Sequence, residues 1–177
     1  MPVVVEPAQP TDFPAIADLT VTTYTSQGWA PPDYQEKLAD VAGRAAQAEL
    51  LVARLAGGGD AGDGGDGGDG GDGAVVGSVA LVLDGAFGEV IDGPHEAAFR
   101  MLVVDSAVRG RGIGEALVRA CLRRAVHAGK TAMVLSTDPR MHTAHRLYER
   151  LGFTRLPERD WSPVPGTDLM VYRRDLP

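Results

Sequence analysis

Several features that mark secreted and membrane proteins are missing from this sequence. The 177 residues include one cysteine, so no disulfide can form within the chain. This residue, Cys121, falls on the apolar side of a predicted helix, and we expect it in the core. No apolar run approaches the ~20 residues that cross a bilayer. The opening residues, MPVVVEPAQP, lack both the basic segment and the apolar core of a secretory signal. We therefore expect a cytoplasmic protein that does not associate with membranes.

Basic residues are not in excess, which argues against a nucleic-acid partner. The formal net charge is −7, and five of the aspartates lie in a glycine- and aspartate-rich tract, residues 57–73. Outside that tract, 17 basic residues face 19 acidic ones, so the body of the protein offers no strongly basic face. The four histidines lack ligand spacing with cysteine or acidic partners, and no metal site is predicted.

Length and hydrophobic periodicity predict one α/β domain over residues 1–177. Short apolar runs predict strands over residues 3–5, 50–55, 74–83, 99–104, 132–137, 153–156 and 168–173. Apolar residues at helical spacing predict helices within residues 11–27, 31–48, 113–128 and 139–151. The order β-α-α-β-β-β-α-β-α-β-β combines strand–helix–strand units with an antiparallel hairpin. We therefore expect a mixed sheet flanked by helices.

The tract at residues 57–73 reads GGGDAGDGGDGGDGGDG. Its one apolar side chain is Ala61, so it cannot bury apolar area, and we expect a flexible loop inserted into the hairpin of strands 50–55 and 74–83. Such an insertion costs little, because loop-closure entropy grows only logarithmically with length.

The segment that indicates a function lies between the predicted strand 99–104 and the helix after it. It reads Arg109-Gly110-Arg111-Gly112-Ile113-Gly114, with glycines at alternate positions. Glycine has no Cβ, so another group can approach its backbone closely. The helix N-terminus adds unpaired N–H groups and the positive end of the helix dipole. This pattern predicts a loop that binds a pyrophosphate.

Two common phosphate-binding motifs do not fit this loop. A G-x-G-x-x-G fingerprint would need its third glycine where Glu115 or Leu117 stands, and no lysine follows the glycines as a P-loop requires. The pattern R/Q-x-x-G-x-G/A does fit, through Arg109, Gly112 and Gly114.

A second segment, residues 144–153, reads AHRLYERLGF and matches the pattern A-x-x-L-Y-x-x-x-G-F. The two motifs, in this order, resemble those of the GNAT superfamily of acetyl-coenzyme A-dependent N-acetyltransferases. The opening VEPAQPTDFPAIADL is similar to that superfamily's first strand and helix. The resemblance spans most of the chain, with the tract 57–73 as an insertion. It implies a GNAT-like fold and acetyl-coenzyme A as cosubstrate.

The resemblance also implies roles for individual residues. Backbone groups of the strand residues Leu102, Val103 and Val104 would pair with the pantetheine arm. The pyrophosphate would bind the loop residues Arg109, Gly110, Arg111, Gly112, Ile113 and Gly114. Tyr148 matches the tyrosine that lies near the coenzyme sulfur and acts as general acid.

The chemistry of thioester aminolysis agrees with these roles. An amine attacks the thioester carbonyl, and a thiol of pKa ~8.5 leaves more easily when a tyrosine of pKa ~10 donates a proton. The general base is less clear, because Ala98 stands where some GNAT proteins have a glutamate. Glu96 lies two residues earlier on the same strand face, and we hypothesise that it accepts the amine proton through water. Met141 stands where many members have an asparagine that contacts pantetheine.

Several functions are compatible with the sequence. The leading hypothesis is an N-acetyltransferase that acts by direct attack in a ternary complex on a primary amine of a small molecule or peptide. A non-catalytic acyl-coenzyme A-binding or sensing domain is the alternative, supported by Ala98 and Met141. A third is a structural module that recruits basic partners through residues 57–73. An edge strand near the C-terminus is also compatible with a homodimer.

Overall fold

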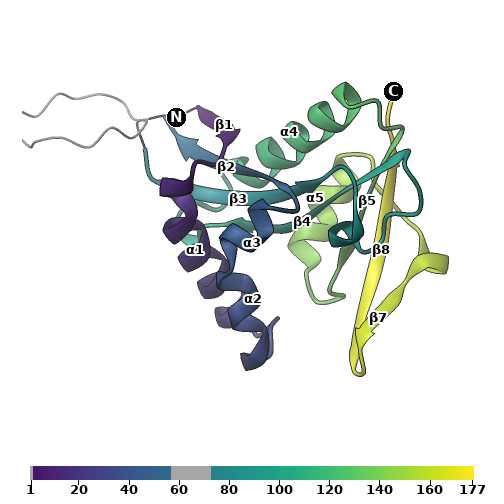
Figure 1. Cartoon of the computed structure of the whole chain (residues 1–177), viewed down its shortest axis with the longest axis horizontal. Coiled ribbons are helices and arrows are strands. Elements are labelled where there is room, and N and C mark those ends of the chain that lie inside the picture. Colours follow the sequence, from purple (N-terminus) through teal and green to yellow (C-terminus); the bar gives the residue numbers. More distant parts are fainter. Residues whose placement is uncertain (1, 57–72) are drawn as a thin grey trace, which may run out of the picture.

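The computed structural model describes residues 2–56 and 73–177, and its centre is an eight-stranded mixed sheet (Figure 1). The strands are β1 (Val3–Pro7), β2 (Glu49–Leu55), β3 (Val75–Val82), β4 (Glu96–Val104), β5 (Ala132–Thr137), β6 (Thr154–Arg155), β7 (Trp161–Val164) and β8 (Thr167–Asp175). Their order is β1-β2-β3-β4-β5-β8-β6, with β7 paired to β8 off this path. Only β4 and β5 pair in parallel among the described strands. The predicted mixed α/β sheet is confirmed.

Helices cover both faces of this sheet (Figure 1). They are α1 (Phe13–Ser26), α2 (Gln35–Ala39), α3 (Val41–Ala45), α4 (Ile113–His127) and α5 (His142–Arg150). Alternate side chains of β2 explain the two layers, because successive residues of a strand point to opposite faces. Leu51 and Ala53 pack with α4 and α5, whereas Leu50 and Val52 pack with Ile16 of α1. No helix in the described part of the chain has the length and apolar character to cross a bilayer.

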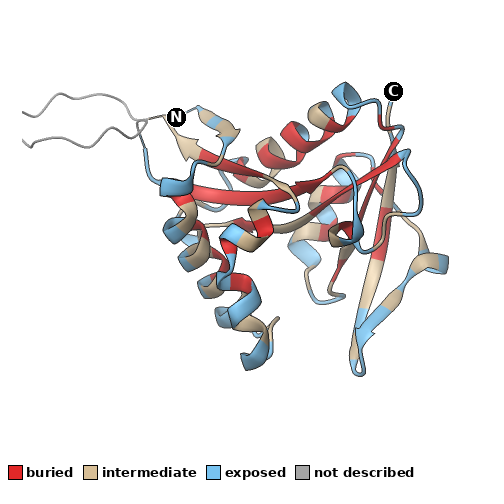
Figure 2. Cartoon of the chain, viewed as in Figure 1, coloured by how far each residue is buried: buried red, intermediate tan, exposed pale blue. Residues whose placement is uncertain are grey.

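The core is concentrated around the middle strands and α4. Buried residues fill β2 to β5 and the sheet-facing side of α4, while α1 and α2 expose their outer faces (Figure 2). Cys121 of α4 is fully buried, which confirms its predicted place in the core. Burial raises the pKa of its thiol to about 12. This side chain therefore packs as a small apolar group.

The centre of the sheet opens between β4 and β5. These strands pair only where Glu96–Ala98 meets Ala132–Val134, within the described residues. Farther along, β4 pairs with β3 alone and carries a bulge: Ser78 and Ala80 of β3 are two residues apart, but their partners Val103 and Arg100 are three apart. Met101, inside the bulge, has a positive φ of 53°. The gap leaves the second half of β4 with a free edge.

One local prediction was wrong, and one strand was missed. The predicted helix 31–48 is divided into a 3₁₀ turn, α2 and α3, because Asp40 leaves the helical region with ψ of 71° and its carboxylate accepts from the Gly43 N–H at 2.9 Å. The strand β7 was not predicted, because it is short and contains Pro163, which removes a backbone donor. Of the predicted loop 57–73, residues 57–72 lie outside the described residues.

Candidate functional site

The glycine loop leaves β4 and turns into α4 with an exposed backbone. Asp105 starts the turn by accepting from the Ala107 N–H at 2.9 Å. Gly110 and Gly112 have φ of 79° and 76°, a region that strains other residues. No atom of the described residues lies within 4 Å of the positions that a Cβ would occupy there. The loop backbone is therefore open to an incoming group.

The third glycine of the loop lies in the first turn of α4. Gly114 has no positive φ, and a Cβ there would lie 3.4 Å from Leu147 Cδ2 and 3.7 Å from Val104 Cγ2. The helix start is thus in contact with both β4 and α5. No side chain of the described residues caps the N-terminus of α4 at Gly112. Its first N–H groups and the helix dipole favour an anion here.

The exposed side chains around this helix start are basic. Arg109 and Arg111 are exposed on the loop, while Ile113 and Leu117 hold the helix in the core. The loop therefore combines a rigid anchor, free amides and two guanidinium groups. This combination suits a pyrophosphate.

The free edge of β4 lies next to the loop. Leu102 and Val104 are half-buried and pack against the α4 cluster, and Val103 is buried. Because β5 has separated from β4 at this point, the backbone groups on that edge have no strand partner among the described residues. An extended ligand with amide groups can pair with such an edge as a further strand would.

Tyr148 of α5 lies within an aromatic cluster whose other members come from strands on both sides of the gap between β4 and β5. Its ring centroid is 5.8 Å from that of Phe99 on β4 and 6.0 Å from that of Tyr172 on β8. Burial raises the pKa of the Tyr148 hydroxyl far above its usual value, and the nearby Tyr24 and Tyr172 hydroxyls raise it further. The side chain therefore stays protonated across the physiological range.

Glu96, at the start of β4, is 2% exposed and held by an arginine. Its two carboxylate oxygens accept from Arg159 Nη1 and Nη2, both at 2.9 Å, and one accepts from the Asp92 N–H at 2.8 Å. Burial would raise the pKa of Glu96, but the Arg159 guanidinium and the Asp92 amide outweigh it and hold the pKa below its usual value. Arg173 adds a contact at 3.5 Å. This geometry ties the loop before β4 to the turn before β7.

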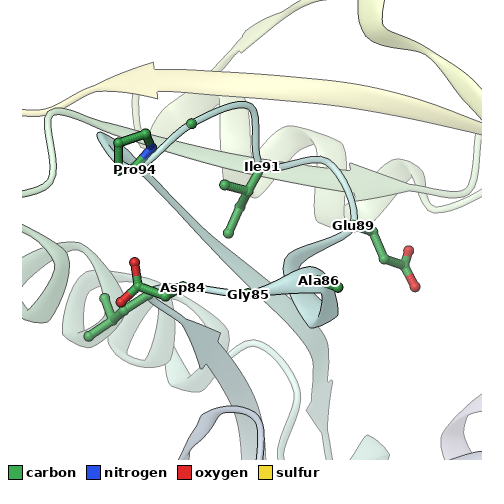
Figure 3. A pocket seen from close by; sticks show the side chains of 8 residues that line it. Asp84, Gly85, Ala86, Glu89, Ile91 and Pro94 are labelled. Carbon is green, nitrogen blue, oxygen red and sulfur yellow. The ribbon is translucent and has the colours of Figure 1, made fainter.

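Two cavities adjoin the loop between β3 and β4, and the sequence analysis identified neither. The side chain of Ile91 points into the first, of about 300 Å³, whereas the side chain of Glu89 points away from it (Figure 3). The second, of about 320 Å³, is lined by side chains that include Arg44, Glu89 and Arg100. No local motif marks these residues. No group of three or more His, Cys, Asp or Glu side chains in the described ranges is placed to hold a metal ion.

Comparisons with known proteins identify the family. The model of the acetyltransferase (GNAT) family matches residues 61–153, which is more than half of the chain. The chain therefore belongs to the acetyltransferase (GNAT) family, whose cosubstrate is acetyl-coenzyme A.

Relatives of known sequence match part of the chain. Human N-acetylaspartate synthetase is 39% identical over 98 residues, which cover 52% of this chain and 32% of that protein. The zebrafish (Danio rerio) protein of the same name is 42% identical over 67 residues, or 38% of this chain and 24% of that protein. The chain thus spans about a third or less of the length of these relatives.

Solved structures match the whole fold. A GNAT-family acetyltransferase from Staphylococcus aureus Mu50 superposes with a TM-score of 0.72 at 15% identity, covering 99% of this chain and 100% of that one. The yncA protein of Salmonella typhimurium, a putative acetyltransferase solved with its cofactor acetyl-CoA, superposes with a TM-score of 0.66 at 19% identity. The match covers 100% of this chain and 95% of that one. At these identities the match establishes the fold.

Proposed function

We propose that this chain transfers the acetyl group of acetyl-coenzyme A to a primary amine by direct attack in a ternary complex. The observation that carries the proposal is the continuity of three features along one path. These are the open glycine loop, the free edge of β4 and the protonated Tyr148. A ligand with a pyrophosphate at one end and a thioester at the other would contact all three in that order.

The residues proposed for coenzyme binding have distinct tasks. The amides of Gly110, Gly112 and Gly114 would hold the pyrophosphate, together with those of Arg111 and Ile113. Arg109 would add charge at the rim of the loop. The backbone of Leu102, Val103 and Val104 would pair with the pantetheine amides, because the free edge of β4 supplies alternating donors and acceptors.

Tyr148 is proposed as the general acid. When the amine attacks, negative charge develops on the carbonyl oxygen and then on the leaving sulfur. A tyrosine whose pKa is raised by burial carries its proton when the sulfur leaves, and the raised pKa also makes it a weaker acid than a solvated tyrosine. Leu147, the neighbour of Tyr148, contacts the first turn of α4, so the acid and the phosphate loop are held in one rigid unit.

Glu96 as general base stays a prediction. Its carboxylate is saturated by donors, and its lowered pKa makes it a weak proton acceptor. A positioning role fits these contacts better: Glu96 would hold the loop that carries Glu89. The acceptor amine would then lose its proton to water.

The names of the relatives suggest which class of acceptor amine to test first. N-acetylaspartate synthetase is named for an acetylated amino acid, and a small amino acid is accordingly the first acceptor to test. A homodimer through a C-terminal edge strand and a single domain over residues 1–177 stay predictions.

A thiol-release assay tests the proposal. The protein is incubated with acetyl-coenzyme A and a panel of amino acids, polyamines and peptides, and free thiol is followed together with the mass of each amine. We expect amine-dependent thiol release and a product heavier by one acetyl group. Tight coenzyme binding with no acetylated amine in the panel would instead favour the acyl-coenzyme A-sensing alternative.

A further inference from the structure

The 320 Å³ cavity lies beside the bulge of β4, between the α2–α3 segment and the loop that joins β3 to β4. Arg100 and Met101 both line it, although consecutive residues of a regular strand point to opposite faces. The bulge accounts for this, because the positive φ of Met101 interrupts the alternation. The cavity therefore reaches β4 at the point where β4 leaves β5.

Arg44 of α3 is the unusual residue in its wall. It is 4% exposed, and one terminal nitrogen donates to the Leu38 carbonyl at 2.6 Å. Its Nε has no hydrogen-bond partner among the described residues, and none of the ion pairs within them includes Arg44. Burial lowers the pKa of Arg44, and the opposing influence of Tyr24, Tyr34 and Asp40 does not outweigh it. A guanidinium in such a place is usually paired with a carboxylate or phosphate.

The carboxylates of the cavity are already engaged. Glu89 lies 2.7 Å from Arg100 Nη2, and Asp40 accepts from the Gly43 N–H. Lys37 and Arg44 add two further positive charges to the same wall. The lining therefore carries more positive than negative charge, in a chain whose formal charge is −7. An anion with one or two carboxylate oxygens would complete the site.

The Glu89–Arg100 side of the cavity is held in a fixed shape. Glu89 has φ of 54° and ψ of −62°, and the Val90 N–H donates to the Gly88 carbonyl at 2.6 Å across it, which is a γ-turn of the strained kind. Arg100 stacks 4.5 Å above the Phe87 ring and donates to the Phe87 carbonyl at 3.0 Å. Glu89 and Met101 are the non-glycine residues with positive φ in the described chain, and both line this cavity. Such strain concentrates at ligand-binding sites.

Tyr24 of α1 connects this cavity to the proposed general acid. Burial, with a contribution from Tyr34, raises the pKa of Tyr24 to about 12, while Arg100 and Arg44 lower it. The same Tyr24 hydroxyl also raises the pKa of Tyr148. Tyr24 is therefore near enough to both Arg44 and Tyr148 to influence the pKa of each.

We propose that the cavity binds a carboxylate of the acceptor through Arg44, so that the acceptor is an amine that also carries a carboxylate, with its amino group directed toward the bulge of β4. Arg100 and Lys37 add positive charge to the rim. This inference rests on the proposed acetyl transfer, and it adds the chemical class of the acceptor and the residue that selects it.

The test compares each free acid with its amide, which lacks the carboxylate charge. Thiol release is measured on the unaltered protein with glycine against glycinamide, and with glutamate against its α-amide and glutamine. Conversion to the α-amide also lowers the pKa of the amine, so a larger fraction of the amine is unprotonated and reactive. Amine reactivity alone would therefore favour the amide. We expect kcat/KM to be about tenfold to a hundredfold higher for at least one free acid than for its amide, the range for a hydrogen bond to a charged group.

Variants assign the effect to the cavity. Arg44→Met should raise KM for the free acid about tenfold or more and leave KM for the amide unchanged, and Arg44→Lys should fall between. Arg124→Met is the matched control, because this half-buried arginine of α4 pairs with Glu49 and does not line the cavity. Binding of the free acid to the protein saturated with coenzyme A, measured by calorimetry, should weaken in parallel.

The outcomes separate the two proposals. If no amine is acetylated, the proposed function is wrong. If amines are acetylated and the acids show no advantage over their amides, or if the advantage survives in Arg44→Met, the acetyl transfer stands and the carboxylate site is wrong. Preference for a phosphate-bearing amine such as O-phosphoethanolamine over every amino acid would also overturn it.

Discussion

The two faces of the sheet build their proposed binding sites in different ways. On the α4 side, one continuous stretch of chain forms the glycine loop, and the contacts offered are backbone amides. On the α1–α3 side, the cavity takes its charged side chains from α2, α3, the β3–β4 loop and β4. The first site depends on conformations that glycine alone adopts without strain, and the second on charges brought together by the fold. Substitutions should therefore affect the two faces separately.

The largest effect is expected at Tyr148, which lies on the α4 side. Tyr148→Phe should lower kcat by about 10²–10⁴-fold, because it removes the proton donor and keeps the ring packing. The affinity for acetyl-coenzyme A should change little. Since burial raises the pKa of Tyr148, kcat of the unaltered protein should show no alkaline loss from this residue below pH ~10. Unchanged turnover in the phenylalanine variant would remove Tyr148 from the mechanism.

The second prediction contrasts two buried arginines. Arg54 lies 2.7 Å from the half-exposed Glu6 and 2.6 Å from the buried Asp12, so Arg54→Met should cost about 3–5 kcal/mol, chiefly by leaving the Asp12 carboxylate unpaired. Arg44→Met removes a charge that has no ion-pair partner within the described residues, together with the donor to the Leu38 carbonyl, and we expect a smaller cost of about 1–3 kcal/mol. Denaturant unfolding of both variants measures the difference. Equal losses would mean that Arg44 serves the fold.

The third prediction concerns the glycine loop. Gly112→Val should lower acetyl-coenzyme A affinity by about a hundredfold, because a β-branched residue at φ of 76° is strained and moves the loop amides. Gly114→Ala is the matched control, since its Cβ would meet Leu147 and Val104 at ordinary contact distances and no positive φ is required. Calorimetric titration of acetyl-coenzyme A measures both. Normal binding by the valine variant would show that the loop is not the phosphate site.

The smallest effect is expected at Glu96. Its pKa is lowered in the folded state, so its contribution to stability is present above pH ~4.5 and is lost as the pH falls through the folded pKa. Glu96→Gln should cost about 1–3 kcal/mol at pH 7, and the cost should shrink in acid. The exposed Glu158→Gln is the control.

The same Glu96 variant separates a base from a positioning residue. If Glu96 only holds the loop, the unfolding midpoint moves and the pH profile of kcat keeps its shape. Loss of the acidic limb of that profile, with unchanged stability, would establish Glu96 as the base.

The features of this protein that depend on short stretches of sequence could be predicted. The loop 109–114, the order of the elements and the buried place of Cys121 follow from short patterns of glycine and apolar residues. The division of helix 31–48 at Asp40 was not predicted, because a capping carboxylate within an alanine-rich stretch resembles any exposed acid. The partners of Glu96 were also missed, since Arg159 lies 63 residues away in the chain.

The cavity on the α1–α3 side had no sequence signal at all. Arg44 is one of 17 basic residues, and nothing next to it in the chain distinguishes it. What distinguishes Arg44 is a property of the fold: its side chain is buried, and it has no ion-pair partner among the described residues. A useful indicator for such sites is therefore a buried charge that its own protein leaves unpaired.

A crystal structure with coenzyme A and glutamate bound together is the decisive experiment for both proposed sites. We expect the pyrophosphate on the amides of the loop 109–114 and the pantetheine arm along the free edge of β4. The sulfur would lie beside Tyr148, and a glutamate carboxylate on Arg44. Coenzyme bound away from the loop, or a glutamate whose carboxylates both avoid Arg44, would contradict it.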